Sequence, residues 1–303
     1  MAAIPLELAH DVPLAPFTTI RVGGTARACA TAHSFREGTE ALAWAAARDL
    51  PVAVIGKGSN LLISDDGFSG LALRLSGRLS TIVVRDRQLW CGGGASLPRA
   101  VQRAAKHGLA GLEFGASIPG SVGGAVAMNA GAYRSELKDV LRWAVVCTAD
   151  GRRRVGPDDL EMGYRHTSLR GGDVVAAAAF DLRPDDPEAI LARLGEFRGQ
   201  RRATQPQGVR TFGSVFANPP GDSSGRLLES VECKGLAIGG ARFSPVHANF
   251  IEAGPECRAE DVLALMREGR KRVAASGGPV LEPEVRFLDP VKGIVRPPLG
   301  EAG

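Results

Sequence analysis

The chain has 303 residues, of which 44% are hydrophobic and 23% charged, and its formal net charge is +4. These values are ordinary for a globular protein, and the length leaves room for two domains with separate cores. The five cysteines are far apart and form no Cys-x-x-Cys pair, which argues against a zinc site and a disulfide framework. No metal is expected.

The charge pattern and the start of the chain exclude two further classes. The concentrated basic stretch from Arg198 to Arg210 lacks the interleaved aromatic side chains of a nucleic-acid platform. The first 17 residues show no basic region followed by an apolar core, and no apolar run approaches membrane-spanning length. We therefore expect a cytoplasmic protein that neither binds nucleic acid nor inserts into a membrane. We also expect a monomer, although these features do not determine the oligomeric state.

Hydrophobic periodicity predicts a mixture of helices and strands. Helices are expected over residues 35–48, 97–107, 187–202, 223–231 and 259–275. Strands are expected over 52–55, 71–75, 81–84, 88–91, 142–148, 174–182, 213–217, 248–252 and 279–288, with 81–84 and 88–91 forming a hairpin. A polar segment at 203–207 suggests a domain boundary, and the Pro- and Gly-rich tail from Pro290 is expected to be loosely ordered.

Three glycine clusters lie in the first half of the chain. The first is at 18–26, and the second, Gly56 to Leu61, directly follows the buried strand expected at 52–55. The third spans 111–136 and is rich in small and apolar residues with little charge. Glycine lets backbone N–H groups approach a ligand closely, and successive N–H groups can form an anion site. A tightly packed turn without a ligand is the alternative for each cluster taken alone.

Several polar residues stand in places that packing does not require. Ser214 and Asn218 interrupt an apolar segment, and Arg165 follows Tyr164 in a compact polar cluster. Along 281–287 charged and apolar residues alternate, so Glu282 and Glu284 would share one face of a strand. The alternatives are a structural serine, a surface arginine and a solvated strand face.

Taken together and in this order, these segments resemble the UDP-N-acetylenolpyruvoylglucosamine reductase family, in its shorter class. The resemblance runs from about Thr18 to about Leu288, and the sequence motifs at 118–125 and 128–133 are its most specific part. It implies an α+β fold: an FAD-binding domain of the vanillyl-alcohol-oxidase type at 1–200, and a small α+β substrate-binding domain at 201–303. The first domain would consist of two α+β subdomains, at about 1–75 and 76–200.

The resemblance also implies an NADPH-dependent oxidoreductase of peptidoglycan synthesis, with non-covalent FAD and with UDP-GlcNAc-enolpyruvate as substrate. Ser214 would protonate C2 of the enolpyruvyl group, while Arg165 and Glu284 would flank its carboxylate and stabilise the enolate. Tyr133, Tyr164 and Asn218 would contact the substrate. The residues expected to bind FAD are Gly56, Gly58, Ser59, Asn60, Leu61, Ile118, Pro119, Gly120, Ser121, Gly123, Gly124, Asn129 and Gly131.

Two residues depart from the family pattern. Many members have Lys or Arg where Ala217 stands, and Arg134 replaces a common glycine. Two other readings stay open: another FAD-dependent oxidoreductase of the same superfamily, and a flavin-binding protein without turnover.

Overall fold

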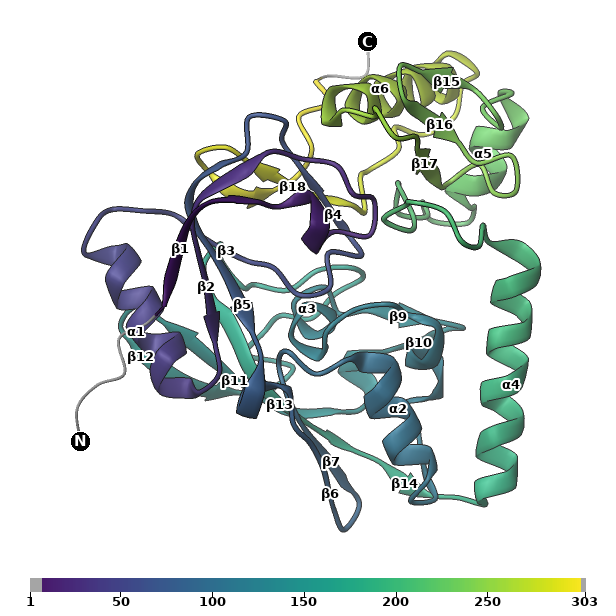
Figure 1. Ribbon diagram of the computed structural model, residues 1–303. Coiled ribbons are helices and arrows are strands. Elements are labelled where there is room, and N and C mark those ends of the chain that lie inside the picture. The colour runs from purple at the N-terminus through teal and green to yellow at the C-terminus, as the bar shows by residue number, and fades with distance from the viewer. Residues whose placement is uncertain (1–6, 301–303) are drawn as a thin grey trace. The chain divides into compact units, whose positions relative to one another are not determined.

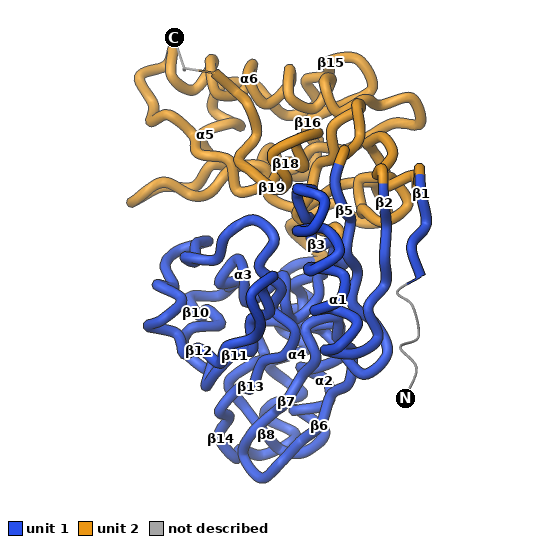
Figure 2. Tube along the Cα trace, turned by 90° about the vertical axis from the view of Figure 1, so that its left-hand side faces the viewer, with its two compact units in different colours: residues 1–10, 28–57, 70–201 blue, residues 11–27, 58–69, 202–303 orange. Residues whose placement is uncertain are grey.

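A computed structural model of the chain describes residues 7–300, so residues 1–6 and 301–303 of the two expected domains lie outside the described part. The described chain forms two compact units (Figure 2). The first contains residues 7–10, 28–57 and 70–201, and the second contains residues 11–27, 58–69 and 202–300. The chain therefore passes between the units repeatedly along its sequence.

A four-stranded sheet has the order β1 (Leu8–Pro13), β2 (Thr25–Ala32), β5 (Phe68–Leu75) and β3 (Val52–Val54). Helix α1 (Phe35–Ala46) begins at Ser34, whose hydroxyl accepts the N–H of Glu37; the Glu37 carboxylate accepts the N–H of His33 at 2.8 Å. These reciprocal bonds satisfy donors at the helix start. Leu42 of α1 and Leu71 of β5 share a core of the first unit.

A second sheet of the first unit has five antiparallel strands. Their order is β12 (Gly151–Val155), β11 (Leu141–Thr148), β13 (Val174–Asp181), β7 (Gln88–Gly92) and β6 (Ile82–Arg85). Helices α2 (Leu97–Ala105) and α3 (Val122–Ala127) contact this sheet, and they share with it a second hydrophobic core.

The rest of the first unit surrounds the glycine-rich segment. Strands β9 (Gly131–Ala132) and β10 (Ser135–Glu136) form a short hairpin, and β8 (Leu109–Ala110) pairs with β14 (Arg183–Pro184). The long helix α4 (Pro187–Thr204) stands beside this hairpin (Figure 1). Short 3-10 helices of this unit lie at Gly77–Ser80, Glu113–Ser117 and Leu137–Asp139, whereas that at Ala15–Phe17 belongs to the second unit.

The second unit has its own core, two small sheets and two helices. Strand β4 (Leu61–Ile63) pairs in parallel with β18 (Arg286–Asp289), which pairs with β19 (Gly293–Val295). Strands β15 (Ala237–Ile238), β16 (Ala241–Phe243) and β17 (Ile251–Ala253) form the other sheet, and the helices are α5 (Ser224–Ser230) and α6 (Ala259–Ala275). The Asp65 carboxylate accepts the N–H groups of Ala259 and Glu260, at 2.9 and 3.2 Å, and so caps α6.

The predicted helices are all present, and so are the hairpin at 81–91 and the strands at 52–55, 71–75, 142–148 and 174–182, with small shifts at their ends. The strands predicted at 213–217 and 279–288 are wrong as continuous strands. Ser214 and Phe216 make only isolated bridges, and pairing after Pro283 resumes only at Arg286. The strand predicted at 248–252 begins only at Ile251.

The tail from Pro290 is ordered over its described residues, which corrects the expectation. It contains β19, and Arg267 and Arg270 of α6 donate hydrogen bonds to the carbonyl oxygens of Pro298 and Gly300.

Candidate functional site

The loop from Gly56 to Asn60 follows β3 and requires its glycines. A Cβ on Gly56 would lie 2.3 Å from Ser121 Oγ, within the first unit. In the second unit Gly58 has φ +61°, and a Cβ there would lie 2.2 Å from the carbonyl oxygen of Phe17. A larger residue at Gly58 would force the backbone apart, and one at Gly56 would displace the Ser121 hydroxyl. The next residue in the loop after Asn60, Leu61, is buried in β4, so its side chain serves the core.

Backbone donors accumulate in these glycine segments. Among the described residues, the N–H groups of Gly56, Lys57, Gly58 and Asn60 have no hydrogen-bond acceptor, and neither do those of Gly120 and Ser121. The Ser117 hydroxyl is buried and likewise lacks a partner within residues 7–300. Unpaired backbone donors are rare in folded proteins unless water or a ligand satisfies them. Each segment by itself therefore suits a ligand rich in acceptors, such as the diphosphate of FAD.

The remaining residues around the α3 start are explained by packing. Ser121 Oγ accepts the N–H of Gly124 at 3.3 Å, and the Gly123 N–H donates to the Gly93 carbonyl at 2.7 Å. A Cβ on Gly123 would come within 2.8 Å of the Val175 carbonyl oxygen. The close approach of α3 to the five-stranded sheet thus depends on glycine. Just before α3, the N–H of Ile118 donates to Gly115 and Pro119 has no N–H to offer.

Asn129 is fully buried and bonds only within its unit. Its Nδ2 donates to the carbonyl oxygen of Gly163 at 2.8 Å and to the Glu136 carboxylate, while its Oδ1 accepts the N–H of Lys138 at 3.0 Å. All of its hydrogen-bonding capacity except one lone pair is therefore used internally. Asn129 ties the glycine-rich segment to the turn that carries Arg165.

Arg165 lies in a tight turn between Gly163 and His166, whose backbones exchange hydrogen bonds of 3.0 and 3.1 Å. Its φ is +53°, a left-handed conformation that is uncommon for arginine. The guanidinium lies 4.8 Å from the Tyr164 ring centroid, and Nη2 donates to the carbonyl oxygen of Gly131 at 2.7 Å. The side chain is thus oriented by the glycine-rich segment, while the Tyr164 ring is half exposed.

Tyr133 stands at the tip of the β9–β10 hairpin, with φ +53°, and the next residue, Arg134, has φ +64°. Two successive positive φ values define a type I′ turn, which explains why glycine is common at the second position. The Tyr133 ring stacks on Phe197 of α4 with centroids 4.0 Å apart, and its hydroxyl donates to the Phe197 carbonyl oxygen at 2.8 Å. Its hydroxyl is therefore engaged inside the first unit.

In the second unit, Ser214 and Glu284 lie on two extended segments that run antiparallel. The N–H of Glu284 donates to the Val215 carbonyl oxygen at 2.9 Å, and Phe216 lies opposite Pro283. Both candidate side chains are partly buried. The Ser214 hydroxyl makes no hydrogen bond with any described residue, so it is available for a ligand.

The glycine loop and an upstream threonine support this pair of segments. Asn60 donates from Nδ2 to the Glu284 carbonyl oxygen at 3.2 Å and accepts the N–H of Arg286 at 3.1 Å. Thr19 Oγ1 lies 2.6 Å from the Thr211 carbonyl oxygen and 3.3 Å from that of Gly58. The sequence pointed to the cluster at 18–26 but assigned Thr19 no role.

Asn218 and Glu282 have partners of their own. Asn218 Oδ1 accepts the N–H of Ser224 at 3.0 Å and so helps to begin α5, whereas its Nδ2 has no partner among the described residues. Glu282 forms an exposed ion pair with Arg296 at 2.9 Å. Because this pair accounts for Glu282, Glu284 remains the stronger catalytic candidate of the two.

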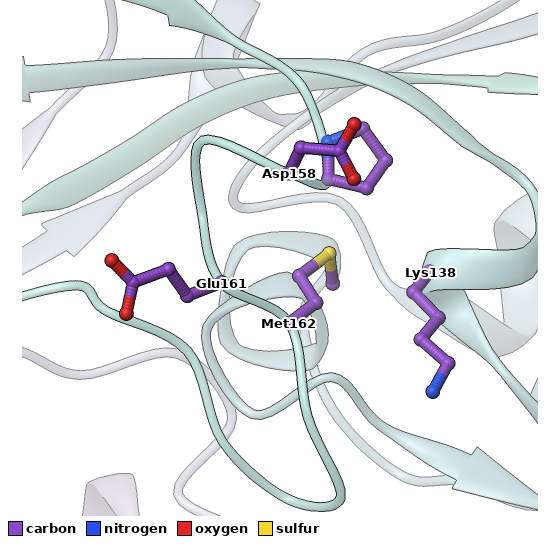
Figure 3. A pocket seen from close by; sticks show the side chains of 5 residues that line it. Lys138, Asp158, Glu161 and Met162 are labelled. Atoms are coloured by element: carbon purple, nitrogen blue, oxygen red, sulfur yellow. The ribbon is translucent and has the colours of Figure 1, made fainter.

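Two surface hollows are lined by residues other than the candidate catalytic ones. One, in the first unit, is lined by Lys138, Pro157, Asp158, Glu161 and Met162 (Figure 3). Its mixed charges do not suit a phosphate group, and it contains no predicted site residue. The other, in the second unit, is lined by Ala15, Pro16, Thr19, Arg21 and Arg210 and has only basic charges. The residues described include no cluster of three metal-ligating side chains, and no helix in that part of the chain is long and apolar enough to cross a membrane.

The fold and the donor-rich glycine loops define a flavin-binding class of protein. Residues 26–155 match the family model described as an FAD binding domain. Residues 205–288 match the C-terminal domain of UDP-N-acetylenolpyruvoylglucosamine reductase.

Relatives of the whole chain point to one family. The chain is 45% identical to the UDP-N-acetylenolpyruvoylglucosamine reductase of Anaeromyxobacter dehalogenans (strain 2CP-C), over 93% of this chain and 86% of the relative. It is 41% identical to UDP-N-acetylenolpyruvoylglucosamine reductase 2 of Symbiobacterium thermophilum, over 93% and 92%. The crystal structure of the reductase from Thermus caldophilus superposes with a TM-score of 0.81 at 36% identity, covering 93% of this chain and 98% of that one.

The chain therefore belongs to the UDP-N-acetylenolpyruvoylglucosamine reductase family. The resemblance, the α+β fold class with an FAD-binding domain, and FAD as cofactor are confirmed.

Proposed function

We propose that this chain catalyses the NADPH-dependent reduction of UDP-N-acetylglucosamine enolpyruvate to UDP-N-acetylmuramate, a step of peptidoglycan synthesis. The observation that carries the proposal is the hydrogen bond from Asn60, in a glycine loop suited to FAD, to the backbone of Glu284, in the segment matched by the reductase C-terminal domain. An FAD oxidase of sugars would need the loop but not this segment.

The chemistry assigns a task to Ser214. FAD, held by the glycine loops, would supply the hydride chemistry that links NADPH to C3 of the enolpyruvyl group. Ser214 then donates a proton to C2, and the loss of a positioned acid costs about a hundred- to ten-thousandfold in rate. Its partial burial and its hydroxyl, which has no acceptor or donor within residues 7–300, support this role.

Arg165 and Glu284 stabilise the negative charge that develops on the enolpyruvyl group during hydride addition. The Arg165 guanidinium, oriented by the Gly131 carbonyl, is of the type that pairs with a substrate carboxylate. Glu284 lies on the segment paired with that of Ser214 and acts on the enolate from there. Groups that stabilise charge present only in the transition state contribute most to rate.

The substrate contacts and the division of function are part of the proposal. Tyr164, Tyr133 and the free amide of Asn218 contact the substrate, and the basic hollow at Arg21 and Arg210 suits phosphate groups of substrate or NADPH. We assign FAD binding to residues 1–200, with subdomains at about 1–75 and 76–200. We assign substrate binding to residues 201–303. The protein acts as a cytoplasmic monomer.

A coupled assay tests the proposal. The purified protein is expected to contain FAD and to oxidise NADPH only when UDP-GlcNAc-enolpyruvate is present, with mass spectrometry detecting UDP-N-acetylmuramate. NADPH oxidation that transfers electrons to oxygen alone would favour another FAD oxidoreductase. Bound FAD without any NADPH oxidation would indicate a flavin-binding protein without turnover.

A further inference from the structure

One face of α4 contacts the glycine-rich segment at three points. The contacting residues are Arg193, Phe197 and Arg201, spaced four apart, so they lie above one another on the helix. Their partners, Glu113, Tyr133 and Ser117, flank the residues expected to bind FAD. All six residues belong to the first unit.

The first contact is an ion pair that fixes the beginning of the segment. Arg193 donates to Glu113 Oε1 from Nε at 3.0 Å and from Nη2 at 2.8 Å, and it also contacts Asp185 at 2.6 Å. Glu113 is buried, and its other oxygen accepts the N–H of Gly111 at 2.6 Å. These carboxylates raise the pKa of Arg193. The charge of Arg193 is therefore balanced by the protein itself.

Arg201, at the other end of this face of α4, differs from Arg193 because it has no carboxylate partner among the described residues. Its guanidinium is partly buried, and its one protein acceptor among the described residues is the carbonyl oxygen of Ser117, bonded to Nη1. No carboxylate pairs with it in that part of the chain. Burial lowers the pKa of Arg201, because water is withdrawn from the charge without an anion to replace it. A partly buried cation with unused donors is costly unless something else pairs with it.

The surroundings of Arg201 indicate what that partner is. Ser117, its acceptor, has a buried hydroxyl without a hydrogen-bond partner within residues 7–300. Three and four residues further on, the N–H groups of Gly120 and Ser121 are also unpaired among the described residues. Unpaired donors and an unpaired cation on one segment suit a phosphate, which accepts several hydrogen bonds and carries the opposite charge.

We propose that Arg201 is an FAD-binding residue that neutralises the cofactor diphosphate, and that Arg193 and Phe197 position the glycine-rich segment for it. The inference rests on the proposed FAD chemistry, but its readout is cofactor affinity rather than turnover. Arg193 has its own carboxylates and contributes no charge to the cofactor. Arg201 pairs with no carboxylate among the described residues, so its positive charge is available to neutralise the diphosphate of FAD.

The test compares Arg201 variants in apoprotein reconstituted with FAD, with flavin fluorescence reporting the dissociation constant. Arg201→Met is expected to weaken FAD binding about ten- to a hundredfold, the loss typical of a charged hydrogen bond. Arg202→Met is the matched control, because Arg202 is exposed and its side chain forms no hydrogen bond or ion pair with another described residue. Its FAD affinity is expected to equal that of the wild type.

Two conservative variants separate charge from positioning. Arg201→Lys keeps the charge and is expected to retain most of the affinity, whereas Arg201→Gln can still donate to the Ser117 carbonyl but is expected to bind FAD as weakly as Arg201→Met. Full affinity in Arg201→Gln would overturn the charge role. Equal loss of thermal stability in apo and FAD-bound Arg201→Met, with an unchanged dissociation constant, would show that Arg201 is only structural. Failure of the wild type to bind FAD would instead refute the proposed function.

Discussion

Asn60 donates a 3.2 Å hydrogen bond from its side chain to the carbonyl oxygen of Glu284, a residue 224 positions further along the chain. The Asn60 carbonyl oxygen in turn accepts the N–H of Arg286. One loop residue therefore bonds to the backbone of both neighbours of Val285. Residues 58–60 of the glycine loop and the segment with the candidate catalytic carboxylate are therefore joined within the second unit.

Loss of this link is expected to disturb the reaction of the substrate more than the reaction of NADPH. In Asn60→Ala the Glu284 segment loses one hydrogen bond, worth about 1 kcal/mol. Small displacements of catalytic groups cost up to about a hundredfold in rate. We expect flavin reoxidation by the substrate to slow about tenfold or more in stopped-flow measurements. Lys57→Ala, in the same loop but exposed, is the control, and an unchanged reoxidation rate in Asn60→Ala would contradict the link.

Ser214→Ala isolates the protonation step. Reduction of the flavin by NADPH is expected to stay close to the wild-type rate, because it does not use the serine. Reoxidation by UDP-GlcNAc-enolpyruvate is expected to slow about a hundred- to ten-thousandfold. The two half-reactions are followed separately by flavin absorbance without oxygen. If both slowed to the same extent, Ser214 would not be the proton donor.

Arg134→Gly is expected to stabilise the protein. Arg134 has φ +64° at the second position of the β9–β10 turn, a conformation that costs a residue with a side chain about 1 kcal/mol and glycine almost nothing. Urea unfolding should show a gain of about 0.5–1 kcal/mol. Asp86→Gly, at φ +53° in the β6–β7 hairpin, is the comparison. Aspartate tolerates this region, so its gain should be smaller; a loss of stability in Arg134→Gly would refute the argument.

His247 is expected to make the stability depend on pH. Burial, with a smaller effect of Lys234, lowers the pKa of His247 from its ordinary value. Below an unfolded-state pKa of about 6.5 the unfolded chain therefore binds a proton more readily than the folded one. The free energy of unfolding should fall as the pH falls through that value towards the lower folded pKa, and then level off.

The matched variant for this effect is His247→Gln, which cannot titrate. Urea unfolding at about pH 7.5 and about pH 5.5 compares the two proteins. The wild type should lose more stability than the variant on acidification. Equal losses would mean that His247 contributes nothing, and that other groups cause the pH dependence.

The sequence predicted the helices because their apolar spacing is regular, and the glycine loops because their composition is unusual. It failed where pairing is irregular. The segment at 213–217 has Gly213 at φ +86° and two prolines after it, so only Ser214 and Phe216 form bridges. The strand at 279–288 contains Pro283, which has no N–H for a ladder. Strand β2 was missed because its alanines lack the β-branched side chains that mark strands.

Long-range contacts explain what the sequence did not reveal about the site. Asn129 was expected to bind FAD, yet its contacts with Gly163, Glu136 and Lys138 give it an internal role that no local pattern shows. Arg201 was hidden in a basic stretch, because only its burial and its lack of a carboxylate distinguish it from its neighbours. The interleaved segments of the two units also follow from pairings between strands distant in sequence.

The most direct test is an anaerobic double-mixing stopped-flow experiment on the wild-type protein. NADPH is mixed with the enzyme first, and UDP-GlcNAc-enolpyruvate is added once the flavin absorbance has bleached. The account predicts bleaching by NADPH and then rapid recovery of the oxidised flavin spectrum by this substrate. Bleaching without recovery would contradict the proposed acceptor, and the absence of any flavin spectrum after FAD is added would contradict the interpretation of the glycine loops.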